Sequence, residues 1–272
     1  MSTDEELRRL SRKVRIDVLR ATTEAGSGHP GGSLSSTDIL VTLFWRVLRH
    51  DPKNNHWPDR DRFILSKGHS APALYSVLAE RGYFPKEQLH HLREHNSILQ
   101  GHPDATRTPG VEVSSGSLGN GLSISSGIAA ALKLDQRESR VYCLLGDGEC
   151  DEGLVWEAAM FAAHKRQDNL TAIIDRNGLQ IDGPTEKVVS LEPLADKWRS
   201  FNWNVICVNG HDHSQLLTAF EEAKKVKGKP TVIIADTVKG KGVSFMQGVV
   251  SFHGKACTQA ELEKACKELE GI

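Results

Sequence analysis

The sequence predicts an α/β fold, a parallel sheet flanked by helices on both faces. The first observation is that helical patterns and short apolar runs alternate along the chain. The second is that the runs at 141–145 and 170–174 are almost entirely apolar, as strands buried on both faces are. Strands that alternate with helices are joined by right-handed crossovers and therefore run parallel.

The expected elements follow in order along the chain. Helical patterns occur near residues 4–20, 35–49, 71–81, 86–95, 120–134, 153–166, 213–226 and 258–270. Strands are expected at 63–65, 141–145, 170–174, 205–208 and 231–235. There is no internal repeat and no linker rich in Pro or Gly. We therefore expect one domain over 1–272, with 1–20 and 258–272 as flanking helices.

Composition narrows the class of protein. The chain has 272 residues, 39% of them hydrophobic, and a formal net charge of -1, which allows a substantial core and argues against a nucleic-acid partner. No apolar stretch approaches the roughly 20 residues of a membrane-spanning helix. The polar amino-terminal residues do not resemble a secretory signal, so a cytoplasmic location is expected. Five cysteines without a CxxC pair argue against disulfides and structural zinc.

Two predicted strands are followed by polar side chains that suit a cation. Asp147 comes just after the run 141–145, and Asn177 comes just after the run 170–174, thirty residues later. Ligands of open α/β sheets bind at the carboxyl ends of the strands, where we expect these two side chains to meet. A carboxylate, a carboxamide and a backbone carbonyl suit a hard cation such as Mg²⁺, which usually also binds phosphate oxygens. We interpret the pair as half of a metal-diphosphate site.

Four histidines stand beside glycines in predicted loops. Glycine lets the backbone approach a ligand closely, and histidine donates, accepts or shuttles a proton near neutral pH. One such histidine is more often a surface or turn residue, but four in the same context favour a site. They are His29, His69, His102 and His253. A polar helical pattern instead predicts that His90, His91 and His95 face solvent.

Two glycine-rich segments are further candidates for ligand contact. The segment from Gly116 to Gly121 has the spacing GxxGxG and no strand before it, so it is not a dinucleotide-binding loop. Its small residues still allow a flat ring to pack against the backbone. Lys239 follows the strand at 231–235 in a Lys-Gly-Lys-Gly segment, where it either meets a diphosphate or belongs to a solvated turn.

Two glutamates near the predicted helix 153–166 have two possible roles. Glu152 stands at the start of the helix, where the helix dipole favours negative charge, and Glu157 lies in the next turn. Both flank the apolar packing face instead of lying opposite it. A capping charge with a solvated glutamate is one interpretation, and a functional role is the other.

Taken together, these residues resemble the transketolase family. The pair Asp147 and Asn177 is similar to the thiamine diphosphate motif, and the flanking stretches match in the family's order from about residue 20 to 255. The matching stretches are SGHPGG at 27–32, LSKGHSAP at 65–72, GHP at 101–103, GSLGNG at 116–121, LGDGE at 145–149, KGKG at 239–242 and FHG at 252–254.

The resemblance implies a role for each matched residue. It implies that Asp147, the Asn177 side chain and the Leu179 carbonyl hold Mg²⁺ or Ca²⁺, which anchors the cofactor diphosphate. Cofactor-binding residues would be His69, Gly116, Ser117, Leu118, Gly148, Asn177, Lys239 and His253. Catalytic residues would be His29, His69, His102 and His253, lining the substrate channel, and Glu152, in an interface network between two cofactors. Glu157 matches an acidic position of the same network.

The resemblance covers only the amino-terminal part of the family. It implies the N-terminal subunit of a split transketolase, which transfers a two-carbon ketol unit from a ketose phosphate to an aldose phosphate through a thiamine diphosphate enamine. The glutamate that activates the cofactor would come from a pyrimidine-binding domain, and no segment here matches that domain. We therefore expect a C-terminal partner subunit, in an assembly of two copies of each chain.

The sequence is also compatible with other functions. The nearest are a sulfosugar or apulose transketolase, a deoxyxylulose phosphate synthase-like enzyme and the α subunit of a 2-oxo acid dehydrogenase. The glycine-histidine loops around His29, His69 and His102 favour a sugar-handling transketolase over an enzyme of keto acids. A non-catalytic regulatory subunit is a fourth possibility, and the presence of Asp147 and Asn177 argues against it.

Overall fold

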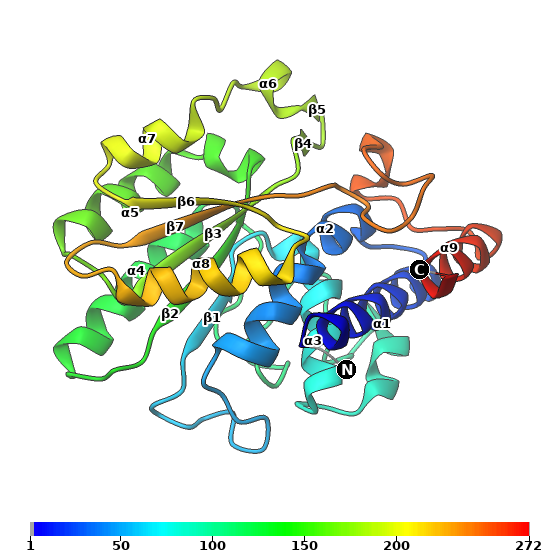
Figure 1. Cartoon of the computed structure of the whole chain (residues 1–272). Helices are drawn as coiled ribbons and strands as arrows, with labels where there is room; N and C mark the ends of the chain where they lie inside the picture. The colour runs from blue at the N-terminus through cyan, green and yellow to red at the C-terminus, as the bar shows by residue number, and fades with distance from the viewer. Residues whose placement is uncertain (1–2, 272) are drawn as a thin grey trace.

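The computed structural model describes residues 3–271 and contains a five-stranded parallel sheet. Residues 1, 2 and 272, at the ends of the expected domain, lie outside the described residues. The strand order is β1-β2-β3-β7-β6 (Figure 1). The strands are β1 (Arg62–Leu65), β2 (Val141–Gly146), β3 (Leu170–Arg176), β6 (Asn204–Asn209) and β7 (Thr231–Asp236). Each contains one of the five predicted apolar runs, so the predicted strands are confirmed.

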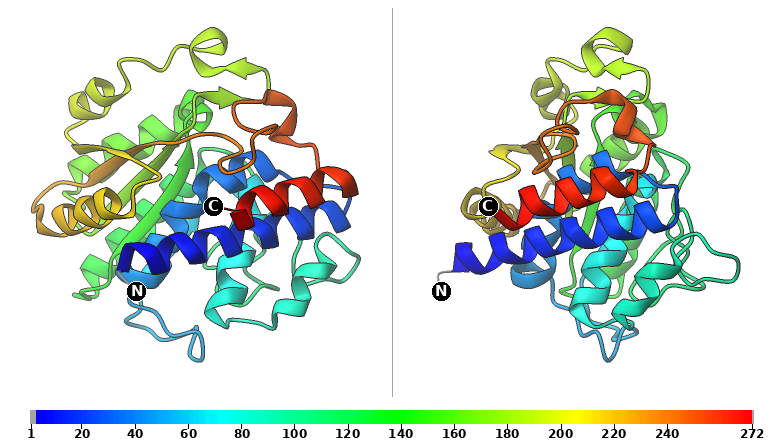
Figure 2. Two further views of the ribbon diagram at one scale, coloured as in Figure 1. Left: turned by 45° about the vertical axis from the view of Figure 1, so that its right-hand side comes forward. Right: turned by 90° about the vertical axis from the view of Figure 1, so that its right-hand side faces the viewer.

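Helices cover both faces of this sheet (Figure 1). One face packs against α4 (Asn120–Leu134), α5 (Gly153–His164) and α7 (Leu194–Ser200). The other face packs against α2 (Pro30–Thr42) and α8 (His213–Lys225), and behind these lie α1 (Thr3–Glu24), α3 (Ala71–Arg81) and α9 (Gln259–Gly271). The helices α1 and α9 run side by side in both views of Figure 2. The predicted α/β fold class is confirmed.

The two cores alternate along each strand. On β2, Tyr142 and Leu144 belong to the core under α2 and α8, whereas Val141, Cys143 and Leu145 belong to the core under α4 and α5. This period of two is the consequence of the strand pleat. Both sets are completely buried, which explains why the sequence shows an uninterrupted apolar run instead of an alternating one.

Some expected elements differ in the structure. The helix expected at 35–49 begins at Pro30 and ends in a π-helical turn at Leu43–Val47. The helix expected at 86–95 is a 3₁₀ turn at Lys86–His91, in which only Leu89 is buried. One buried residue does not stabilise a longer helix, because most helical stability comes from packing an apolar face. His90, His91 and His95 are exposed, as predicted.

Several short elements were not expected from the sequence. The hairpin of β4 (Leu179–Gln180) and β5 (Gly183–Pro184) and the helical turn α6 (Thr185–Val188) follow β3. The helix α7 buries Leu194 and Trp198, which are four residues apart and therefore on one face. Among residues 3–271, no helix combines the length and the apolar character needed to cross a bilayer.

Candidate functional site

The carboxyl ends of β2, β3 and β7 surround a cleft of about 350 Å³. The end of β2 is in register with the end of β3, because Gly146 pairs with Asp175. This register brings the loops after the two strands together, as expected for parallel strands. Residues lining the cleft include His69, Leu118, Asp147, Gly148, Glu152, Asn177, Leu179, Lys239 and His253. Most of the predicted site residues therefore lie around one cavity.

Asp147 joins the loops that follow β2 and β3. Its carboxylate accepts hydrogen bonds from the backbone N–H groups of Gly148 at 2.8 Å and Gly178 at 2.6 Å. The guanidinium of Arg176 lies 3.2 Å from the same carboxylate. Asp147 is only 2% exposed, and its burial, followed by the neighbouring Asp175 charge, raises the pKa of its carboxyl. A cation at this carboxylate would relieve the cost of burying the charge.

Asn177 and Leu179 line the same cleft as Asp147. The Asn177 amide nitrogen donates to Asp175 at 3.2 Å, and its oxygen accepts from the Leu179 N–H at 3.2 Å. The Leu179 carbonyl accepts from the Lys239 ammonium at 3.0 Å. One carboxylate, one carboxamide and one carbonyl form a donor set suited to a small hard cation. The ammonium already bound to the Leu179 carbonyl shows that this oxygen faces positive charge.

Lys239 is a buried cation at the mouth of the cleft. It is 2% exposed, and its ammonium donates to Nδ1 of His253 at 2.8 Å. Burial, together with the nearby Lys67, lowers the pKa of Lys239 to about 8. The loop is held in place by the Gly240 N–H, which donates to the Gly31 carbonyl at 3.0 Å. An anionic ligand in the cleft would therefore meet a poorly solvated positive charge.

Three of the four predicted histidines form one cluster. The ring centroids of His29 and His69 are 5.3 Å apart, those of His29 and His253 are 5.5 Å apart, and those of His69 and His253 are 5.2 Å apart. Burial lowers the pKa of His29 to about 4 and that of His253 to about 3, and it lowers the pKa of His69 further. All three rings are neutral at pH 7, so each carries one N–H donor and one acceptor nitrogen.

His102 lies apart from that ring cluster, on the loop next to it. Its side chain is exposed and contacts the segment at 116–121, because a Cβ added to Gly116 would lie 3.2 Å from its Cδ2. Gly68 packs equally closely on the same segment, with Ser115 and Gly116 atoms at 2.8 to 2.9 Å from an added Cβ. Gly68 therefore has no room for a side chain, whereas a side chain at Gly116 would require a small shift of the His102 ring. Leu118 reaches the cleft, whereas Ser117 is exposed.

The structure separates the two glutamates. Glu152 is exposed and lines the cleft just before α5. Glu157 is exposed on α5 and is not among the residues that line the cleft. Glu152 thus lies at the cleft, and Glu157 lies on the neighbouring helix surface. A functional role for either glutamate stays a prediction.

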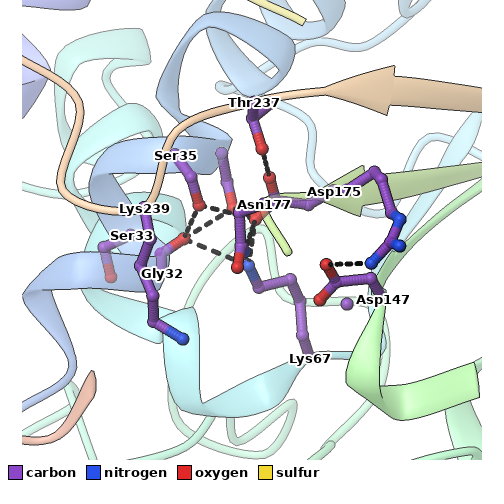
Figure 3. Close-up of polar contacts among 12 residues, drawn as sticks. Gly32, Ser33, Ser35, Lys67, Asp147, Asp175, Asn177, Thr237 and Lys239 are labelled. Carbon is purple, nitrogen blue, oxygen red and sulfur yellow. Dashed lines mark hydrogen bonds and ion pairs between the residues drawn. The ribbon is translucent and has the colours of Figure 1, made fainter. Parts of the chain in front are cut away.

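Sequence reasoning missed a buried ion pair beneath the cleft. Lys67, 1% exposed, donates to Asp175, which is completely buried. Asp175 also accepts from the hydroxyls of Ser35 at 2.6 Å and Thr237, as Figure 3 shows. Burial alone raises the pKa of Asp175, but the Lys67 charge and these donors bring it below its usual value. The sequence signal was a lysine two residues after a predicted strand.

Glu149 was also missed as a site residue. It is 2% exposed and follows Asp147 and Gly148 in the turn at Gly148–Asp151. Burial raises the pKa of its carboxyl, while hydrogen bonds from Ser66, Gly119 and Gly146 act in the opposite direction. In the sequence it closes the matching stretch LGDGE at 145–149, but no role was assigned to it.

Comparison with known proteins identifies related chains. Residues 7–271 match the family model described as transketolase, thiamine diphosphate binding domain. The chain is 44% identical over 265 residues to the 6-deoxy-6-sulfo-D-fructose transketolase subunit of Clostridium sp. (strain MSTE9), covering 97% of this chain and 96% of the relative. It is 41% identical over 265 residues to one subunit of the apulose-4-phosphate transketolase of Phocaeicola vulgatus, covering 97% of this chain and 94% of the relative.

Full-length transketolases match over less than half of their length. The transketolase of Homo sapiens is 40% identical over 264 residues, which are 97% of this chain and 42% of that protein. The crystal structure of the transketolase from Campylobacter jejuni superposes with a TM-score of 0.93 at 33% identity, covering 99% of this chain and 43% of that one. The chain thus has the extent of the two separate subunits and spans about two fifths of the single-chain proteins.

Proposed function

Because this chain belongs to the family of transketolase thiamine diphosphate binding domains, we propose that it is the diphosphate-binding, N-terminal subunit of a two-chain transketolase. The reaction is the transfer of a two-carbon ketol unit from a ketose phosphate to an aldose phosphate. The observation that carries this proposal is the convergence of Asp147, Asn177, the Leu179 carbonyl and Lys239 on one cleft beside a histidine cluster.

In this proposal the cleft holds the cofactor and its cation. Asp147, Asn177 and the Leu179 carbonyl hold Mg²⁺ or Ca²⁺. Gly148, Lys239 and His253 would contact the diphosphate, and the segment of Gly116, Ser117 and Leu118 would lie along the aminopyrimidine. When bound, thiamine diphosphate supplies a thiazolium carbon that stabilises negative charge on the transferred fragment. The protein residues bind and orient this group.

The histidines act on the sugar in their neutral form. His29 and His69 each present a donor and an acceptor nitrogen to the hydroxyl and carbonyl oxygens of a ketose. His253 accepts from the Lys239 ammonium at Nδ1, so the proton of its neutral ring is on Nε2, which can donate to a substrate oxygen. His102, at the exposed rim, contacts the outer part of the sugar. These rings hold and move protons as the bond between C2 and C3 breaks.

A partner subunit completes the site. No described residue here is assigned to proton removal from the pyrimidine side of the cofactor, and a C-terminal subunit with a pyrimidine-binding domain would supply that glutamate. Exposed apolar side chains support such an interface. Ile181, which lines the cleft, is 65% exposed, and Met160 and Phe161, farther along α5, are 56% and 45% exposed. Glu152, at the edge of the cleft, would join the network at this interface. Two copies of each chain form the assembly.

A panel of substrates would identify the ketose donor. Two relatives are subunits for 6-deoxy-6-sulfo-D-fructose and for apulose 4-phosphate. These sugars and common ketose phosphates share the hydroxyketone end that the proposal places at the histidines. Each donor should be offered with an aldose phosphate, and the two-carbon-longer ketose should be quantified. Pyruvate with an aldehyde is the control that detects a keto-acid enzyme.

The decisive experiment combines this chain with a complementing C-terminal transketolase subunit. We expect ketol transfer only with both subunits present, together with loss of activity on metal chelation and recovery with Mg²⁺ or Ca²⁺. Asp147→Ala should reduce turnover by at least about a hundredfold, since it removes a charged ligand of the cation. Asp135→Ala, at the exposed residue just after α4, is the control and should be fully active. Full ketol transfer by the single chain would contradict the two-subunit proposal. Undiminished, metal-independent turnover of Asp147→Ala would contradict the catalytic role.

A further inference from the structure

Glu149 is a buried carboxylate to which the proposed chemistry assigns no role. It follows β2 in the turn at Gly148–Asp151, and it lies in the wall of the cleft. A buried carboxylate is costly unless hydrogen bonds satisfy its oxygens. The partners of Glu149 therefore indicate what this side chain does.

The Glu149 carboxylate joins three separate segments. One oxygen accepts from the Ser66 hydroxyl, directly after β1, and from the Gly119 N–H at 2.9 Å. The other oxygen accepts from the Gly146 N–H at 2.9 Å, at the end of β2. Gly119 belongs to the segment at 116–121, and Gly146 precedes Asp147. One side chain thus ties the pyrimidine-side segment to the metal-binding strand end.

The segments around this carboxylate are closely packed. A Cβ added to Gly121 would lie 2.3 Å from the Ser66 hydroxyl oxygen, and one added to Gly119 would lie 3.0 Å from the Cβ of Glu152. Gly119 also has a positive φ of 85°, which an L side chain rarely adopts. A change in the hydrogen bonds of Glu149 is therefore transmitted to the position of the segment.

We propose that Glu149 is a positioning residue that fixes the segment of Gly116, Ser117 and Leu118 relative to Asp147, and so sets the affinity of the cleft for thiamine diphosphate. This inference rests on the proposed function. Glu149 does not touch the reacting atoms in it. Its carboxylate holds two cofactor-binding segments at the separation that one ligand must span.

The chain offers a matched control at the opposite end of the same two strands. Asp61 precedes β1 and is 5% exposed, and its carboxylate accepts from the backbone N–H groups of Arg49 at 2.9 Å and Arg140 at 2.8 Å. It is a buried carboxylate that joins two segments, as Glu149 is. Because it lies at the amino ends of the strands, it is remote from the cleft.

The test compares Glu149→Gln with Asp61→Asn in complex with the C-terminal subunit. Each amide keeps the size of the side chain but places an NH₂ group against backbone N–H donors. We measure the Kd of thiamine diphosphate with Mg²⁺ by calorimetry, the Tm without ligand, and kcat at saturating cofactor. Glu149→Gln should weaken cofactor binding about tenfold or more and change kcat by less than about threefold. Asp61→Asn should lower the Tm without changing the Kd.

Either of two results with Glu149→Gln overturns the inference. One is an unchanged Kd in a folded Glu149→Gln, and the other is an equal change of Kd in both variants, which indicates a general effect of stability. If Glu149→Gln does not fold, Ser66→Ala, which removes only the hydroxyl donor, should still weaken cofactor binding by several fold, and an unchanged Kd there also refutes the inference. If the unaltered complex does not bind thiamine diphosphate, the proposed function itself fails.

Discussion

The ammonium of Lys67 and the carboxylate of Asp175 form an ion pair that is almost completely buried beneath the cleft. Removing one partner of such a pair leaves an uncompensated charge in the interior. We expect Asp175→Asn to reduce the free energy of unfolding by about 3–5 kcal/mol. Urea unfolding of the chain provides the measurement. Asp196→Asn, which removes an exposed pair with Arg199, should cost less than about 1 kcal/mol. Equal effects of the two substitutions would show that burial of the Lys67 pair is unimportant.

Lys239 makes cofactor binding depend on pH. Its folded-state pKa of about 8 lies below the usual 10.5, so its ammonium loses a proton as the pH rises through 8. A diphosphate binds the charged form better, so its Kd should increase above that pH, by up to about tenfold per pH unit. Calorimetry from about pH 7 to pH 9 tests this expectation. Lys239→Arg, which keeps its charge, should flatten the profile, whereas Lys241→Arg should leave it unchanged. A flat profile for the unaltered chain would contradict the role of Lys239.

The histidine cluster should make the fold sensitive to acid. The pKa of His29 is lowered from 6.5 to about 4, and that of His253 to about 3, chiefly by burial. Below pH 6.5 the unfolded chain binds protons at these histidines, whereas the folded chain does not until the pH reaches the lowered pKa values. The free energy of unfolding is therefore highest above pH 6.5 and decreases as the pH falls from there towards the folded-state pKa values. We therefore expect His29→Gln to make the free energy of unfolding decrease less steeply between pH 6.5 and pH 4. His91→Gln, in an exposed ring, should leave the slope as it is. If the free energy of unfolding decreases equally steeply in the unaltered chain, His29→Gln and His91→Gln, the buried histidines are not the cause of the acid sensitivity.

Two glycines of α4 should respond in opposite directions to the same substitution. A Cβ at Gly121 would meet the Ser66 Oγ at 2.3 Å, whereas a Cβ at Gly127 would meet no atom within 4 Å. Gly121→Ala should therefore destabilise the chain by about 1–3 kcal/mol through overpacking. Gly127→Ala should stabilise it by about 0.5–1 kcal/mol, because alanine is the better helix former. Thermal unfolding of both variants checks the sign, and a stabilising Gly121→Ala would contradict the close approach of α4 to Ser66.

The elements with long apolar runs could be predicted from the sequence. All five strands of the sheet were. In β1, β2, β3 and β7, burial on both faces leaves a continuous apolar segment of the right length. The edge strand β6 is only partly buried, and its apolar run at 205–208 was sufficient to predict it. The polar last residues of these strands, such as Asp175 and Arg176, were not assigned to strands, since hydrogen bonding and not hydrophobicity extends the ladder there. The helix α7 escaped prediction because two buried residues, Leu194 and Trp198, are too few to define a period.

The sequence predicted the site residues that stand just after the strands. Asp147 and Asn177 were expected to meet, and they lie around the same cleft. The partners of Asp175 could not be predicted, because Lys67 is 108 residues away in the chain and only the fold brings the two together. Glu149 and Ser66 are likewise 83 residues apart. Long-range pairs between buried polar groups leave no local pattern in a single sequence.

The pairing of Gly146 with Asp175 has a consequence for how the chain tolerates insertions and deletions. Because the separation of Asp147 and Asn177 is determined by the register of β2 and β3, the intervening crossover can change in length at the turn after α5 without moving either residue. Deleting one residue inside β3 is different. It would exchange the two faces of that strand, so that Ile173 and Ile174 would swap cores and Asp175 would turn away from Lys67. Length variation should therefore be harmless in the connection and disruptive within the strand.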